Sequence, residues 1–189
     1  MNRIREGFTL MEAVVVVAIL GIFASLAISA TLREIWSAEA RAAAEDISQW
    51  METVRRNAMR GAGCTVTIST PSSATSSTTI ATASVQGTPT TAISNQCLIG
   101  TPLQLESVVN SKNTFKIEAS PTTSFTFTSR GTIYNNSAAD GAFSNDLQIS
   151  INTKVGGSAK SPMYCVRIRP PMGEIAVINN SLKTAGRCS

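Results

Sequence analysis

GFTLMEAVVVVAILGIFASLAISATL, residues 7–32, is the stretch that decides the architecture of this chain. Residues 13–32 form a run of twenty without a charged side chain, long enough to cross a bilayer as an α-helix. Arg3 and Arg5 precede the run, so the positive-inside bias places the N-terminus in the cytoplasm and everything after Arg33 outside it. The sequence therefore predicts a single membrane span.

An ordinary secretory signal peptide also begins with basic residues followed by an apolar run. The small residues around Ala27, Ile28 and Ser29 would then be the cleavage site. This alternative does not account for Glu12, because a carboxylate at the start of an apolar membrane segment is costly and usually functional.

The stretch Gly7-Phe8-Thr9-Leu10-Met11-Glu12 resembles the class III signal of type IV prepilins. Glycine, phenylalanine and glutamate stand at the spacing of that family, after a short basic leader and directly before the apolar run. The resemblance implies that a prepilin peptidase cuts after Gly7 and methylates the new N-terminal residue, Phe8. It also implies that Glu12 neutralises the terminal amine of a neighbouring subunit in the filament, since a buried charge without a partner is costly.

Beyond Arg33 the chain continues as an amphipathic helix. Its apolar side chains recur at steps of three and four residues: Leu32, Ile35, Trp36, Ala40, Ala43, Ile47, Trp50, Met51, Val54 and Ala58. Gly61 and Gly63 end this pattern, so we predict a continuous helix over 8–60, about 80 Å long. We expect Trp36 and Trp50 to pack against the core of the C-terminal head.

The remainder of the chain predicts short β-strands. Alternating or β-branched runs lie between Gly, Pro, Asn and Ser turns at 65–69, 78–84, 103–109, 114–119, 124–129, 147–152, 163–169 and 174–178. The expected fold class is α+β, a pilin fold in which a long N-terminal helix packs on a C-terminal antiparallel sheet. The predicted segments are a leader over 1–7, a transmembrane and filament-core helix over 8–32, an amphipathic helix over 33–60 and a periplasmic or extracellular head over 61–189.

A weaker resemblance lies in the head. Residues 125–131, 164–169 and 173–177 combine a Phe-rich strand, a glycine turn and a late hairpin, and they are similar to the H-type pseudopilin and minor-pilin group. This resemblance implies a minor pilin or pseudopilin, a structural subunit of a type IV pilus or a type II secretion pseudopilus. The implied partners are other pilin subunits, the prepilin peptidase and the inner membrane.

Residues 61–105 contain no charged side chain, and serine and threonine dominate between positions 69 and 94. Such a composition is also typical of a disordered linker. Apolar residues such as Val66, Ile80 and Ile93 are nevertheless spread through the segment. We therefore predict a long, mobile β-hairpin on the filament exterior.

Four cysteines follow the apolar segment, at wide spacings that fit neither a zinc knuckle nor a CxxC redox pair. Disulfides persist outside the cytoplasm, in agreement with the predicted export. Four cysteines allow three pairings. We favour Cys64 with Cys97, which would close the uncharged segment, and Cys165 with Cys188, which would tie the C-terminal tail to the late strands.

The sequence offers little for catalysis, because it contains no histidine and neither a nucleophile motif nor a cofactor fingerprint. We predict no enzyme, no cofactor and no metal. Asp140, Gly141, Asn145 and Asp146 could line a calcium loop, but their spacing fits no standard pattern and favours an Asx turn.

DNA is the alternative partner, because some minor pilins of this group bind DNA during natural transformation. Arg167 and Arg169 share one strand face, and Lys183 and Arg187 follow in the sequence, so the four could contact phosphates. The DNA-binding members carry a C-terminal Gly-Arg-x-Arg element, whereas this sequence has Gly186-Arg187-Cys188-Ser189 and lacks the second arginine. The alternative function is therefore a DNA-binding minor pilin of a competence pilus.

Overall fold

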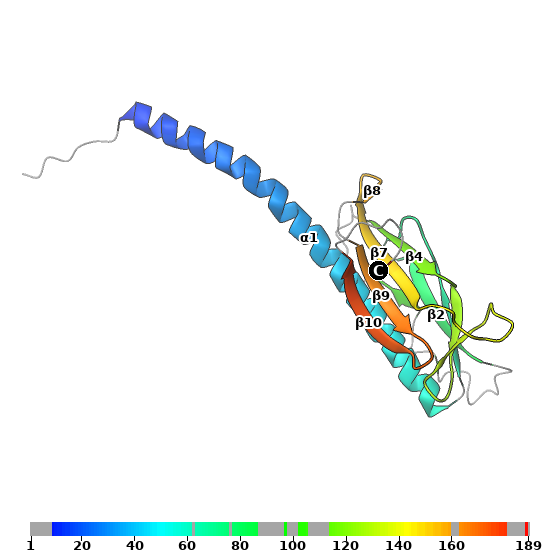
Figure 1. Ribbon diagram of the computed structural model, residues 1–189. Helices are drawn as coiled ribbons and strands as arrows, with labels where there is room; N and C mark the ends of the chain where they lie inside the picture. Colours follow the sequence, from blue (N-terminus) through cyan, green and yellow to red (C-terminus); the bar gives the residue numbers. More distant parts are fainter. Residues whose placement is uncertain are drawn as a thin grey trace, which may run out of the picture. The chain divides into compact units, whose positions relative to one another are not determined.

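A computed structural model gives the fold as one long helix and two antiparallel sheets (Figure 1). It describes residues 9–61, 63–75, 77–86, 97, 102–105, 114–159, 163–180 and 188, except for the side chains of residues 25–31 and 180. The chain divides into two compact units, Met1–Ile35 and Trp36–Ser189, and helix α1 (Leu10–Arg60) contributes to both.

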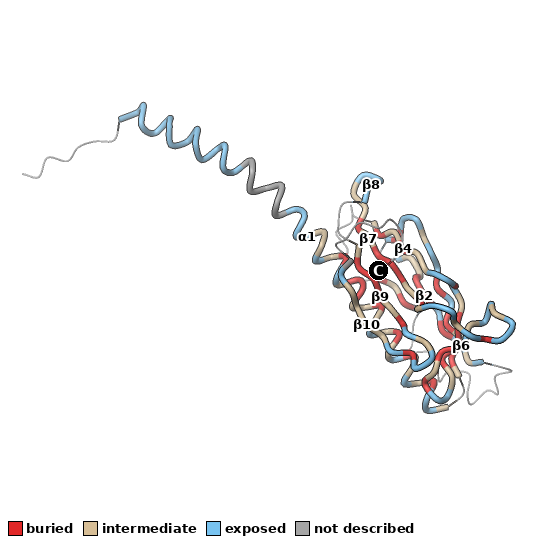
Figure 2. Tube along the Cα trace, in the orientation of Figure 1, coloured by how far each residue is buried: buried red, intermediate tan, exposed pale blue. Residues whose placement is uncertain are grey.

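The described part of the first unit is the N-terminal portion of α1. Every described side chain from position 10 to position 24 is exposed, which Figure 2 shows as pale blue. Most of these side chains are large and apolar: Leu10, Met11, Val14, Val15, Val16, Val17, Ile19, Leu20, Ile22 and Phe23. In the described part of the chain, no helix combines the length and the hydropathy that crossing a membrane requires.

In the second unit, α1 buries one stripe of small and medium apolar side chains. The buried residues are Ala40, Ala43, Ala44, Ile47, Met51, Val54 and Ala58. Their spacing of three and four residues places them on one side of the helix. Trp50 packs against this core at its border, and Trp36 is half-buried. The helix ends at Arg60, directly before Gly61.

Sheet A has the strand order β3-β2-β1-β5-β6 and sheet B the order β10-β9-β7-β4, with β8 paired to β7. The strands of sheet A are β1 (Cys64–Ile68), β2 (Thr79–Val85), β3 (Leu103–Gln104), β5 (Ser124–Phe127) and β6 (Ile133–Asn135). Those of sheet B are β4 (Thr114–Ser120), β7 (Leu147–Val155), β8 (Ser158–Ala159), β9 (Met163–Arg169) and β10 (Glu174–Asn180). All strand pairs are antiparallel.

One hydrophobic core joins the helix stripe to both sheets. Sheet A contributes Phe125 and Phe127, whose rings meet edge to face with centroids 5.2 Å apart. Sheet B contributes Ile149, Ile151 and Val166, all fully buried. The predicted fold class, a long helix packed on a C-terminal antiparallel sheet, is confirmed.

Each predicted β run overlaps a strand, although the run at 103–109 is described only to Leu105. Two short strands, β6 and β8, were not predicted. Within the segment 61–105, β1 and β2 pair antiparallel as a hairpin, as predicted. The expected exterior position is wrong for β1, which lies at the centre of sheet A between β2 and β5. The reason is that Val66 and Ile68 face the core, so burial draws this strand into the sheet. Residues 87–96 of the same segment lie outside the described residues.

Candidate functional site

Thr9 begins the first turn of α1, within the segment that the sequence marks as functional. The Thr9 carbonyl accepts hydrogen bonds from the backbone N–H groups of Glu12 (3.1 Å) and Ala13 (3.2 Å), and its hydroxyl accepts from the Glu12 N–H at 3.3 Å. A threonine N-cap followed three residues later by glutamate is the capping-box pattern. Glu12 uses only its backbone in these bonds, so the bonds themselves do not require its carboxylate.

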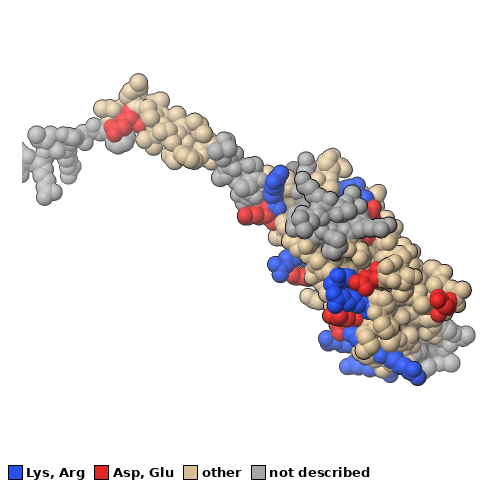
Figure 3. Space-filling model, in the orientation of Figure 1, with Lys and Arg blue, Asp and Glu red and all other residues tan. Residues whose placement is uncertain are grey.

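The Glu12 side chain is exposed, and it carries the only charge among residues 9–24. Figure 3 shows one red group near the start of the helix, followed by a stretch of tan side chains. No contact of the Glu12 carboxylate with another described residue is present. A negative charge is favourable at a helix N-terminus.

Several predicted site residues lie outside the described residues: Gly7 and Phe8 of the processing site, and Lys183 and Arg187 of the proposed DNA contact. Their roles stay predictions.

Two disulfides join the four cysteines in the same pairs that we favoured from the sequence. Cys64 bonds to Cys97 with a Cα–Cα distance of 5.6 Å, and Cys165 bonds to Cys188 with 6.0 Å. The first bond fixes the start of the central strand β1. The second holds Cys188 against sheet B, where its backbone N–H donates to Oε1 of Gln148 at 3.1 Å. All four cysteines are buried, so solvent has little access to either bond.

Arg167 and Arg169 lie on β9, and each is paired with a carboxylate. Arg167 Nε lies 3.6 Å from Asp146 Oδ2, and Arg169 Nη1 lies 3.4 Å from Glu174 Oε2. The Arg167 side chain is also largely buried, at 24% exposure. Partial neutralisation by Asp146 and Glu174 weakens the attraction that these arginines would exert on phosphate groups.

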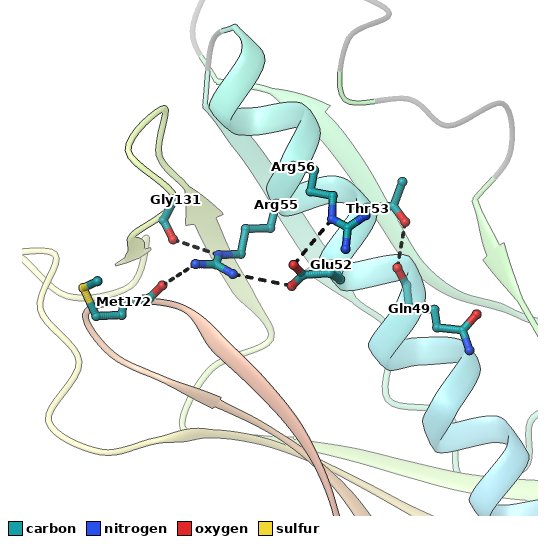
Figure 4. A network of polar contacts seen from close by, with 7 residues as sticks. All are labelled: Gln49, Glu52, Thr53, Arg55, Arg56, Gly131 and Met172. Atoms are coloured by element: carbon teal, nitrogen blue, oxygen red, sulfur yellow. Dashed lines mark hydrogen bonds and ion pairs between the residues drawn. The ribbon is translucent and has the colours of Figure 1, made fainter.

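Arg55 forms a polar network that sequence reasoning did not identify (Figure 4). From α1 its Nε donates to the Gly131 carbonyl at 3.2 Å, and its Nη2 donates to the Met172 carbonyl at 3.0 Å. Its Nη1 lies 3.5 Å from Glu52 Oε2. Gly131 precedes β6 of sheet A and Met172 lies in the β9–β10 turn of sheet B, so one guanidinium joins the helix to both sheets.

Two glycines make this junction compact. Gly131 and Gly173 have φ angles of 77° and 65°, a region that favours glycine. A Cβ on Gly173 would lie 2.8 Å from the Gly131 carbonyl oxygen, and one on Gly131 would lie 2.8 Å from Met59 Sδ. Ile133 N–H also donates to the Pro171 carbonyl at 3.0 Å, which links the two turns directly.

We expect Arg55→Met to lower the stability of the head by about 1–2 kcal/mol, because two carbonyl groups lose a charged donor. Methionine keeps most of the apolar stem, so the loss reports the guanidinium rather than packing. Arg56→Met is the matched control: Arg56 is exposed and touches Glu52 only at 3.6 Å, so its expected effect is under about 0.5 kcal/mol. Chemical unfolding followed by circular dichroism measures both, and equal losses would contradict a special role for Arg55.

The exposed side of α1 carries another ion pair, in which Arg41 Nε donates to Glu45 Oε1 at 2.7 Å. This hydrogen bond and the charge of Glu45 raise the pKa of Arg41 above its ordinary value. Because Arg41 is fully charged at any physiological pH, the shift has no functional consequence.

Asp140 and Asp146, which we considered as ligands of a calcium loop, form contacts with other protein groups. Asp140 Oδ1 accepts from the Ala142 N–H at 3.1 Å, which is an Asx turn, and Asp146 is paired with Arg167. Among the described residues, no group of three or more His, Cys, Asp or Glu side chains could hold a metal ion.

Residues 2–28 match the model of the prokaryotic N-terminal methylation motif. The match supports a type IV pilin-like protein. The matched segment contains Glu12 and the N-cap Thr9, together with the predicted cleavage point between Gly7 and Phe8. No curated protein and no solved structure matches the chain. Type IV pilin-like proteins are structural subunits rather than enzymes, and their signal indicates membrane anchoring, processing by a prepilin peptidase and assembly with other pilin subunits.

Proposed function

We propose that this protein is a minor pilin or pseudopilin that assembles into a type IV pilus or a type II secretion pseudopilus through α1. The observation that carries the proposal is the methylation motif over residues 2–28, joined to a helix that begins with Glu12 in its first turn. The pilin-like combination of this helix with a two-sheet head agrees with the proposal.

The surface of the N-terminal part of α1 supports assembly. Its exposed side chains from position 10 to position 23 are almost all apolar, and water solvates such a surface poorly. Lipid before assembly and the apolar helices of neighbouring subunits after it would both remove this surface from water.

We assign the segments accordingly: a leader over 1–7, a membrane and filament-core segment over 8–32, an amphipathic segment over 33–60 and a head over 61–189. Before assembly the protein crosses the inner membrane once, with the head in the periplasm. This orientation rests on Arg3 and Arg5 before the uncharged run at 13–32.

Processing provides the direct test. Intact-mass and peptide mass spectrometry of the protein from its native host should find an N-terminus at Phe8 that carries one methyl group. The Gly7→Val variant should remain unprocessed, since a branched side chain obstructs the peptidase where glycine does not. An N-terminus at Ala30, as an ordinary signal peptidase would leave, is the outcome that defeats the proposal.

DNA binding in a competence pilus remains the alternative function. It has no further support in the head, because Arg167 and Arg169 are paired with Asp146 and Glu174. Retention of the purified protein on DNA that falls steeply with salt would favour the alternative over the structural role alone.

A further inference from the structure

Five arginines gather at the end of the head where α1 stops. Three lie in the last two turns of α1, one lies in the turn between β5 and β6, and one ends β9: Arg55, Arg56, Arg60, Arg130 and Arg169. Figure 3 shows several blue groups at this end of the head. We call these five residues the arginine cluster.

The network around Arg55 brings the cluster together. Arg55 donates to the carbonyl groups of Gly131 and Met172, so it holds the β5–β6 turn and the β9–β10 turn against the helix. Gly131 directly follows Arg130 and lies close to α1, since a Cβ on it would come within 2.8 Å of Met59 Sδ. The cluster is therefore assembled from three chain segments that are far apart in the sequence.

The cluster carries an excess of positive charge. Two carboxylates contact it, those of Glu52 and Glu174. Five positive charges against two negative charges leave an excess of +3. Arg60 and Arg130 are exposed, and in the described part of the chain neither forms an ion pair. A favourable interaction with the helix dipole accounts for Arg60 in the last turn of α1, but it does not account for Arg130 in a turn of the sheet.

Two large apolar side chains are exposed beside these arginines. Met59 in the last turn of α1 is 44% exposed, and Met172 in the β9–β10 turn is 67% exposed. Arginine and methionine are both enriched at protein interfaces, whereas lysine is depleted there, and the cluster contains no lysine. Guanidinium groups pair well with carboxylates, and methionine adapts its shape to an apolar partner. This end of the head therefore suits a protein surface that carries both carboxylates and apolar groups.

We propose that the arginine cluster docks against an acidic face on the head of another pilin-like subunit; the identity of this partner rests on the proposed function. The partner face differs from the cluster, because two copies of the same end would bring an excess of +3 against +3 and repel each other. A nucleic acid is a poorer match, because its phosphate groups would pair with the arginines without covering the exposed methionines.

Photo-crosslinking of the full-length protein in its native host tests this proposal. The photoreactive amino acid p-benzoylphenylalanine is placed at position 172, where the side chain is exposed and only the backbone carbonyl serves Arg55. Irradiation should give an adduct with a second protein that carries the N-terminal methylation motif, and mass spectrometry should locate the link in a peptide of its head that contains Asp or Glu. The double variant Arg60→Glu, Arg130→Glu should lower the yield of this adduct about tenfold or more, because like charges would then meet.

The matched control is Lys116→Glu, Lys154→Glu, which changes the net charge equally at the opposite end of sheet B and should leave the yield unchanged. The milder variant Arg60→Gln, Arg130→Gln should lower the yield less than the reversal does. Thermal unfolding of all variants should match the wild type, since none of these arginines belongs to the Arg55 network. Replacing the linked carboxylate of the partner with arginine should restore the adduct of the Arg60→Glu, Arg130→Glu variant.

Four results would each overturn the proposal. They are absence of the adduct, an undiminished adduct with the Arg60→Glu, Arg130→Glu variant, a linked peptide without carboxylates, and salt-sensitive retention on DNA that this variant abolishes. The N-terminus of the same protein is mapped in parallel. A subunit that is correctly processed at Phe8 but forms no adduct would overturn this inference and leave the proposed function standing.

Discussion

Replacing Glu12 with alanine is expected to abolish incorporation into filaments while leaving the subunit in the membrane. A charge at the start of the apolar helix is costly in lipid, so its removal favours insertion by up to about 3 kcal/mol. In a filament the Phe8 amine of a neighbour would lose its partner in apolar surroundings, which costs about 3–5 kcal/mol. A loss of that size lowers incorporation by about two orders of magnitude or more.

The structure makes this variant informative, because the Glu12 backbone alone forms the capping bonds to Thr9. Alanine retains these bonds, so the helix should begin as before. The comparison is the amount of processed protein in sheared filaments against the amount in membranes, with Glu34→Ala as the control for an exposed carboxylate on the same helix. Equal recovery of Glu12→Ala and wild type in filaments would show that Glu12 does not drive assembly.

Loss of the Cys64–Cys97 disulfide is expected to destabilise the head strongly. The two residues are 33 apart in sequence, and in the chain-entropy model closing such a loop contributes about 3–4 kcal/mol. Cys64 is also the first residue of the central strand β1, so its loss acts on the middle of sheet A. The Cys64→Ala, Cys97→Ala variant should unfold about 10 °C below the wild type.

The single variants provide the control for this bond. Because both sulfurs are needed, Cys64→Ala and Cys97→Ala should each lose nearly as much stability as the double variant, with strong non-additivity. Peptide mapping without reductant should yield one linked peptide that contains residues 64 and 97. Additive losses, or free thiols at both positions, would contradict the pairing.

Local sequence patterns predicted most of the fold. The three- and four-residue spacing from Leu32 to Ala58, followed by Gly61, located the helix and its end, and alternation located most strands. The short strands β6 and β8 have three and two residues, too few to show a period. The central place of β1 was missed because its second partner, β5, is distant in sequence.

The candidate sites also differ in whether their residues are close together in the sequence. The methylation motif is contiguous, so Glu12 could be identified directly, whereas Arg55 reaches carbonyl groups 76 and 117 residues away. Backbone carbonyl acceptors cannot be recognised from a sequence pattern. Gly131 and Gly173 indicate turns, but they do not show that the carbonyl groups in these turns accept hydrogen bonds from Arg55.

The place of β1 between β2 and β5 determines when sheet A can be completed during synthesis. During translation Thr65 is synthesised well before Thr126, which follows it by 61 residues. Until then β1 has only β2 to pair with, and its second edge stays open to other chains. Cys97 is synthesised well before β5. The Cys64–Cys97 disulfide can therefore form early and hold β1 and β2 together until β5 is available to pair with β1. Cells short of oxidising capacity should therefore lose this subunit to aggregation and proteolysis before any filament is built.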